Sequence, residues 1–205
     1  NFVNYLLEKK INPEKVFIFG DHGTLTYGEV MRDLEDLSSI LYSRYGSRKK
    51  ILLMADNTPF FIISYLAIIA SGNTAILVET RISRTDLSEI AISSSLSGAL
   101  VQDKYGPYFT DAPFEIMNES IIQDNGQKKM PQHLSEGLQD NEIAVIIFTS
   151  GSTGKKKGVM LTHGNMLSNA LVLKDYWGWR SPEQGGDVLI HALPIFHVHG
   201  LFVAI

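Results

Sequence analysis

Short apolar runs alternate with longer amphipathic segments along most of this chain, and that alternation limits the folds it can adopt. The longer segments have ten or more residues, with apolar side chains at helical spacing. A parallel strand pair requires such a crossover, so the pattern predicts an α/β fold of mainly parallel strands with helices on both faces. The runs that we predict as strands are 16–19, 51–55, 75–78, 99–101, 143–148, 159–161 and 187–192.

Capping residues mark the predicted helix starts. Thr26 followed by Glu29 has the spacing of a capping box, and apolar residues recur at helical steps over the following turns. Thr58 is a candidate N-cap, with Pro59 in the first helical position and Gly72 at the end of that helix. Three further helices are predicted, over 2–10, 83–95 and 163–175.

The region 102–142 has no clear periodicity. Turn-forming residues accumulate there, but apolar residues persist, so we interpret it as an irregular strand-and-loop excursion rather than a linker. A chain of 205 residues fits one large domain or two small ones. The apolar end, 201–205, carries no cap or turn signal, and we therefore expect a truncated protein.

Composition excludes several classes of function. The net charge is −4 with no basic stripe, which argues against nucleic acid as the main partner. The chain has no cysteine, which excludes disulfides and thiol chemistry and mildly favours the cytoplasm. The uncharged stretch 57–78 is interrupted by Pro59, Gly72 and Asn73, whereas a membrane span needs roughly 20 apolar residues. We interpret this stretch as a buried helix followed by a strand, not a membrane span.

The strand predicted over 143–148 runs directly into a loop suited to binding phosphate. A triphosphate carries several negative charges and many acceptor oxygens, so its site needs many donors on a closely approaching backbone. Glycines, hydroxyls and lysines supply these features. The loop residues are Thr149, Ser150, Gly151, Ser152, Thr153, Gly154, Lys155, Lys156, Lys157 and Gly158. A solvated loop of the same composition, without a ligand, is the alternative.

Two better-known motifs do not fit this loop. A Walker A motif has Gly, four residues, then Gly-Lys-Ser/Thr, but Lys156 stands five residues beyond Gly151. In a nucleophile elbow, Ser150 would have to be glycine. We therefore expect a turn that joins two strands at an exposed end of the sheet. We also expect the segment 150–157 to be poorly ordered without nucleotide, because its lysines repel one another.

Residues 147–165 resemble the signature of the adenylate-forming superfamily, which includes acyl-CoA synthetases, luciferases and the adenylation domains of peptide synthetases. The usual pattern is Thr-Ser-Gly-Ser/Thr-Thr-Gly-x-Pro-Lys-Gly, and Lys157 falls on its lysine. Lys156 replaces its proline, a departure that we expect to loosen the loop without removing its chemistry. Weaker similarity at 25–29 and 56–59 extends the resemblance along most of the chain.

A second segment, 193–201, resembles the superfamily's next motif, in which an aromatic residue and a histidine wall the site between carboxylate and nucleotide. His197 falls on that histidine. His197 and His199 could instead form half of a metal site or lie in the core, but no cysteine is available and carboxylates are absent nearby. We interpret His163 and His191 as structural.

The resemblance implies that 1–205 is a partial N-terminal AMP-binding domain of the acyl-CoA synthetase branch, which serves fatty acid metabolism, and that a C-terminal domain is absent. It implies ATP-dependent activation of a carboxylic acid as an acyl-adenylate, transfer to coenzyme A, and Mg²⁺ at the phosphates. The metal ligand is expected beyond Ile205, so the fragment alone should be inactive. The implied catalytic residues are Lys157 and His197, and the nucleotide-binding residues are Thr149, Ser150, Gly151, Ser152, Thr153, Gly154 and Lys157.

Three questions stay open at this level. The acyl acceptor could be a carrier protein, as for a fatty acyl-AMP ligase or a peptide-synthetase adenylation domain. The chain could also be a non-catalytic nucleotide-binding scaffold. The stretch 196–202 looks closest to malonyl-CoA synthetases and some fatty acyl-CoA ligases. His199 could therefore bind the distal carboxylate of a dicarboxylic acid, or it could lie in the core, hydrogen-bonded to backbone.

Overall fold

The computed structural model describes residues 2, 11–21, 23–123, 138–150, 156–180 and 185–204, and every structural statement here refers to them. Helices and strands alternate along the chain, as the sequence predicts. The elements are β1 (Val16–Gly20), β2 (Gly23–Thr26), α2 (Tyr27–Tyr45), β3 (Lys50–Met54), α3 (Pro59–Ala70), β4 (Thr74–Leu77), α4 (Arg84–Ser94), β5 (Gly98–Val101), η1 (Asp103–Phe109), β6 (Glu115–Met117), α5 (Ser120–Gln123), β7 (Ile143–Ser150), β8 (Lys156–Thr162), α6 (His163–Trp177) and α7 (Val198–Ala204).

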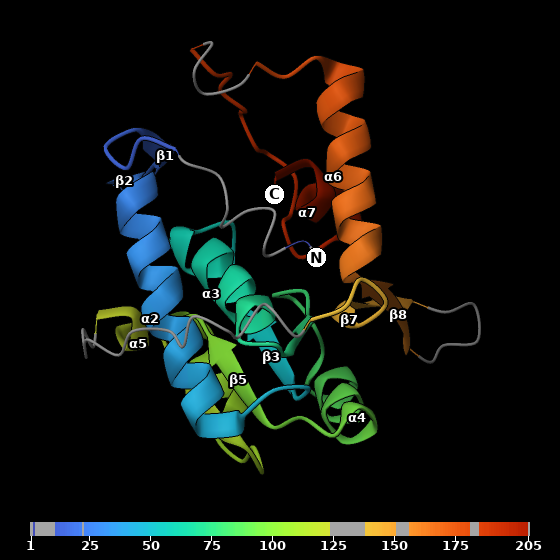
Figure 1. Ribbon diagram of the computed structural model, residues 1–205. Helices are drawn as coiled ribbons and strands as arrows, with labels where there is room; N and C mark the ends of the chain where they lie inside the picture. Colours follow the sequence, from blue (N-terminus) through green and yellow to red (C-terminus); the bar gives the residue numbers. More distant parts are fainter. Residues whose placement is uncertain are drawn as a thin grey trace.

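The central sheet is mainly parallel, which confirms the predicted fold class. Its strand order is β6-β5-β3-β4-β7-β8, and only the last pair, β7 with β8, is antiparallel. A separate antiparallel hairpin, β1–β2, lies at the N-terminal end of α2 (Figure 1). The sequence did not predict β2.

Helices cover both faces of the sheet because the chain changes direction after β4. The crossover through α3 takes the chain one way from β3 to β4, and the crossover through α4 takes it back past β3 to β5. Right-handed crossovers in opposite directions place their helices on opposite faces. The side chains of β3 alternate accordingly. Ile51 and Leu53 pack with α2 and α3, which lie side by side (Figure 1), whereas Leu52 and Met54 pack with α4.

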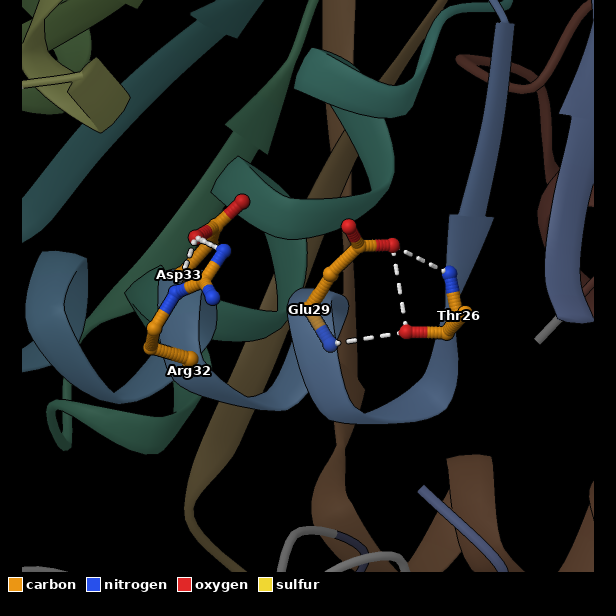
Figure 2. A network of polar contacts seen from close by, with 4 residues as sticks. All are labelled: Thr26, Glu29, Arg32 and Asp33. Carbon is orange, nitrogen blue, oxygen red and sulfur yellow. Dashed lines mark hydrogen bonds and ion pairs between the residues drawn. The ribbon is translucent and has the colours of Figure 1, made fainter. Parts of the chain in front are cut away.

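The predicted capping box and N-caps are present. Thr26 is both the last residue of β2 and the N-cap of α2. Its hydroxyl accepts a hydrogen bond from the Glu29 N–H at 3.2 Å, and the Glu29 carboxylate accepts one from the Thr26 N–H at 2.8 Å (Figure 2). Thr58 caps α3, whose first residue is Pro59, and Gly72 follows its end with a φ of 76°. These local signals fix where both helices begin.

One predicted strand is wrong, and one region is more regular than expected. The segment 187–192 is irregular, and Val188 and Ile190 are 71% and 88% exposed. An apolar run becomes a strand only where a neighbouring strand supplies hydrogen bonds, and this run has no such neighbour among the described residues. Within 102–142, β6 joins the main sheet beside β5. The helix predicted over 2–10 lies almost wholly outside the described residues.

Among the helices that the structure describes, none combines the length and the hydropathy needed to cross a membrane. The uncharged stretch 57–78 forms α3 and β4, as predicted. Its side chains are almost all buried: those of α3 pack with α2 and the sheet, whereas Ile76 and Val78 pack with α4 on the opposite face.

Candidate nucleotide and acyl site

The β7–β8 hairpin holds the two ends of the glycine-rich loop. β7 lies beside the central strand β4, and Thr149 and Ser150 pair with Lys157 and Lys156 in the last two positions of the ladder. The Thr149 hydroxyl donates a long hydrogen bond of 3.4 Å to the Lys157 carbonyl. The loop therefore joins two strands and does not open a helix, as predicted. The residues predicted to bind phosphate between these strands, Gly151, Ser152, Thr153 and Gly154, lie outside the described part, as does the prediction of their disorder.

Gly158 allows the hairpin to close just beyond the loop. A Cβ at this position would lie 2.9 Å from a methyl carbon of Ile146 and 3.3 Å from the Phe148 ring. Both neighbours are side chains of β7, so a larger residue would require those side chains to shift. The last glycine of the motif thus has a packing role in the hairpin, independently of any ligand.

The two lysines at the start of β8 lie in different surroundings. Side chains of consecutive strand residues point to opposite faces of a sheet. The Lys156 ammonium lies 3.0 Å from a carboxylate oxygen of Glu79 and 3.8 Å from one of Asp86. Lys157 is exposed, which leaves its ammonium accessible to a ligand.

The histidine motif is fixed by the turn that follows β3. The Asn57 side chain donates a hydrogen bond of 2.7 Å to the Leu193 carbonyl and accepts one of 2.9 Å from the Ile195 N–H. Ile195 is buried in the core and anchors the segment there. His197 follows, with its ring 4.7 Å from that of Phe196, immediately before α7.

His197 and His199 are both exposed, so the alternative that His199 lies in the core is wrong. His163 and His191 each have a buried ring nitrogen without a hydrogen-bond partner. Burial lowers the pKa of both, and for His191 a hydrogen bond that its ring donates to the Leu193 backbone partly offsets this. Both are therefore neutral, structural histidines, as expected. In the described part of the chain, no three histidine or acidic side chains gather in a geometry that could hold a metal ion.

A small cavity of about 20 Å³ joins the two motifs over the end of β4. It is lined by Lys156 at the loop exit, by Phe196 and His197 from the second motif, and by Glu79. The structure thus brings together residues that are some forty positions apart in the sequence. Thr149 and Lys157 lie at this end of β7 and β8, and His197 lines the cavity beside them.

Asp56 belongs to a polar network beside this site that the sequence analysis did not identify. Its carboxylate accepts hydrogen bonds from the Lys104 ammonium and, at 2.8 Å, from the Tyr105 hydroxyl. Burial alone would raise the pKa of Asp56, but the hydrogen bonds from Lys104 and Tyr105 outweigh it and hold that pKa below its usual value. Its backbone N–H donates to the Gln102 side chain at 3.0 Å. This network fixes the turn that carries Asn57.

Comparison with known proteins agrees with this arrangement. Residues 8–205 match the family model described as AMP-binding enzyme. The mitochondrial malonate–CoA ligase ACSF3 of Xenopus laevis is 23% identical over 92% of this chain and 34% of its own length. The malonate–CoA ligase of Arabidopsis thaliana is 29% identical over 80% of the chain and 28% of its own length. The D-alanine–D-alanyl carrier protein ligase of Bacillus mycoides is 31% identical over 76% of the chain and 31% of its own length.

A solved structure gives the same result for the fold. Apo MatB from Rhodopseudomonas palustris superimposes with a TM-score of 0.84 at 25% identity, covering 100% of this chain and 42% of MatB. The chain thus spans about a third of the length of the curated relatives it matches. Because the family model matches almost the whole chain, this chain belongs to the family of AMP-binding enzymes.

Proposed function

We propose that the full-length protein activates a carboxylic acid with ATP and transfers the acyl group to coenzyme A. In the first step a carboxylate oxygen forms a bond to the α-phosphorus, the bond from that phosphorus to the bridging oxygen breaks, and pyrophosphate leaves. In the second step the thiol loses its proton, its sulfur bonds to the acyl carbon, and AMP leaves. The observation that carries this proposal is the convergence of the loop exit and the His197 segment at one end of the sheet.

The charged and polar groups of the loop fit a triphosphate. The hydroxyls of Thr149, Ser150, Ser152 and Thr153, together with loop amides and the Lys157 ammonium, would hold the β- and γ-phosphates. Such contacts stabilise the charge that builds up as pyrophosphate departs. His197 would wall the acyl site and position the carboxylate without transferring a proton.

Magnesium is part of the proposal only as a counter-ion of the phosphates. A bound Mg²⁺ neutralises part of their charge and orients them. Among the described residues no three histidine or acidic side chains gather where they could hold a metal ion, so no residue of this chain is assigned to the ion and no step depends on one.

Malonate is the first acid to test as the substrate. Two of the relatives above are described as malonate–CoA ligases, and 42% of MatB superimposes on the whole of this chain. His199 is exposed one residue into α7, where it could donate a hydrogen bond to a distal carboxylate. The D-alanyl carrier protein ligase supports a carrier protein as the alternative acceptor.

The decisive experiment is carboxylate-dependent pyrophosphate exchange into ATP, with the full-length protein and a panel of acids. Exchange with at least one acid supports adenylation. If none of the acids supports exchange, the result favours the non-catalytic scaffold. Malonate, acetate and a medium-chain fatty acid should be compared with His199 intact and in His199→Ala. If malonate is no better than acetate, or if the variant leaves their ratio unchanged, a monocarboxylate becomes the substrate. We propose the cytoplasm as the location, on the cysteine-free composition alone.

A further inference from the structure

Lys156 stands where the signature that this loop resembles has a proline, and its surroundings are unlike those of a phosphate-binding lysine. Its side chain is only 17% exposed, although it lies beside the loop. Its ammonium contacts Glu79 at 3.0 Å and Asp86 at 3.8 Å. Glu79 lies just beyond the end of β4, and Asp86 lies in the first turn of α4. The lysine therefore ties the loop exit to two other elements.

These contacts neutralise the charge of Lys156 within the protein. Two carboxylates already share its ammonium, so little of its charge is available to phosphate oxygens. Without the lysine, Glu79 and Asp86 would place negative charge close to an anion site, and like charges in a partly buried site repel strongly. Lys156 thus anchors the backbone and neutralises those carboxylates.

We infer that Lys156 is a positioning residue, which holds the exit of the phosphate loop through its ion pair with Glu79. Lys157 is the next residue on β8, and its side chain leaves the opposite face of the strand. Fixing Lys156 therefore fixes the direction in which Lys157 points. A proline at this position would restrict the backbone through its ring. In this chain the contacts of Lys156 with Glu79 and Asp86 restrict it instead. This inference deepens the proposed function, because the anchored loop is the proposed ATP site.

The test combines two single variants with their double variant. Lys156→Met keeps the length of the side chain and removes its charge, and Glu79→Gln removes the partner charge. Both should speed hydrogen exchange of the amides in 149–158 in the nucleotide-free protein. Both should also raise KM for ATP roughly fivefold, the effect expected of a partly exposed ion pair, with kcat within about twofold. In the double variant neither effect should exceed that of the larger single variant.

Lys174→Met is the matched control. The Lys174 ammonium lies 3.8 Å from Asp175, and its side chain is 50% exposed on α6. The same chemical change there should leave both loop exchange and KM for ATP at wild-type values. Thermal unfolding of each variant checks that the fold is retained.

Opposite signs would overturn the inference. If Lys156 served the phosphates directly, Glu79→Gln would free its ammonium and lower KM, while Lys156→Met would raise it. Unchanged loop exchange in Lys156→Met, or a loss of kcat with KM unchanged, would also contradict a positioning role. Hydrogen exchange needs no catalysis, so it tests the anchor even if no acid supports pyrophosphate exchange.

Discussion

The side-chain oxygen of Asn57 accepts a hydrogen bond from the backbone N–H of Ile195 at 2.9 Å, across 138 positions of the sequence. The amide nitrogen of the same side chain donates to the Leu193 carbonyl at 2.7 Å. One side chain thus satisfies two backbone groups of the segment that leads into His197. Asn57 contributes to the site by fixing this segment.

Replacing Asn57 by alanine should slow adenylation and lower the free energy of unfolding by about 1–2 kcal/mol. Two hydrogen bonds of about 1 kcal/mol each orient the segment, so we expect a loss of roughly tenfold in pyrophosphate exchange. Asn118→Ala, an exposed asparagine at the other edge of the sheet, should have no effect. Equal activity of Asn57→Ala and wild type would show that the buried Ile195 alone fixes the segment.

Gly200→Ala should displace the same segment from the other side. A Cβ on Gly200 would lie 2.2 Å from the Pro194 carbonyl oxygen, a backbone atom that cannot turn away. We expect a loss of about 1–3 kcal/mol in the free energy of unfolding, as for other overpacked sites, and a loss of activity. Urea denaturation measures the change in the free energy of unfolding. Gly106→Ala is the control, since a Cβ there meets no atom within 4 Å.

Lys157→Ala should weaken adenylation roughly ten- to a hundredfold, because a charged phosphate contact contributes about 1.5–3 kcal/mol. Lys155→Ala should have much less effect, because it matches a variable position of the signature. The exchange assay at saturating acid compares them. Equal losses at both positions would mean that the loop acts only through its total charge.

The pH dependence of stability should report on His163. Burial lowers the pKa of this histidine, and the nearby Glu142 only partly offsets that effect. The unfolded chain therefore binds more protons than the folded one as the pH falls below about 6.5, and acid destabilises the fold. Urea denaturation at a series of pH values should show a smaller loss of stability towards low pH for His163→Gln than for wild type. Parallel curves would contradict this.

Thr26→Ala should destabilise the protein by about 1 kcal/mol, the usual effect of removing an N-cap hydroxyl. The variant loses the acceptor for the Glu29 N–H, one half of the capping box shown in Figure 2. Thr26→Ser keeps that oxygen and should retain wild-type stability. Activity per folded molecule should be unchanged in both, because α2 packs against α3 and reaches the β6 edge of the sheet, whereas the β7–β8 hairpin lies at the opposite edge (Figure 1).

Local signals explain what the sequence predicted correctly. A capping box at Thr26 and a Thr58–Pro59 start depend on atoms within one helical turn, and the buried strands are apolar on both sides because helices cover both faces. The strand at 187–192 was wrong because strand formation depends on a distant partner. The sequence did not locate the short strand β6 within 102–142 for the same reason, because its pairing with β5 defines it.

The site residues divide in the same way. Lys157 and His197 lie in motifs that can be recognised from adjacent residues. Asn57 and Glu79 act on segments far away in the sequence, and no pattern around them predicts those contacts. Glu79 could have been suspected only after Lys156 was seen to replace a proline, because a new charge on a buried strand end requires a partner.

The pairing of β7 with β4 has a consequence for the order of folding. The Thr74 hydroxyl donates to the Ile143 carbonyl at 2.9 Å across 69 positions, whereas β3, α3 and β4 are neighbours along the chain. Contacts that close long loops form late, because chain entropy opposes them. We expect β3, β4 and their helices to assemble during synthesis before β7 leaves the ribosome. The strand that leads into the glycine-rich loop then docks onto an existing edge, and nascent chains halted before β7 should already resist proteolysis.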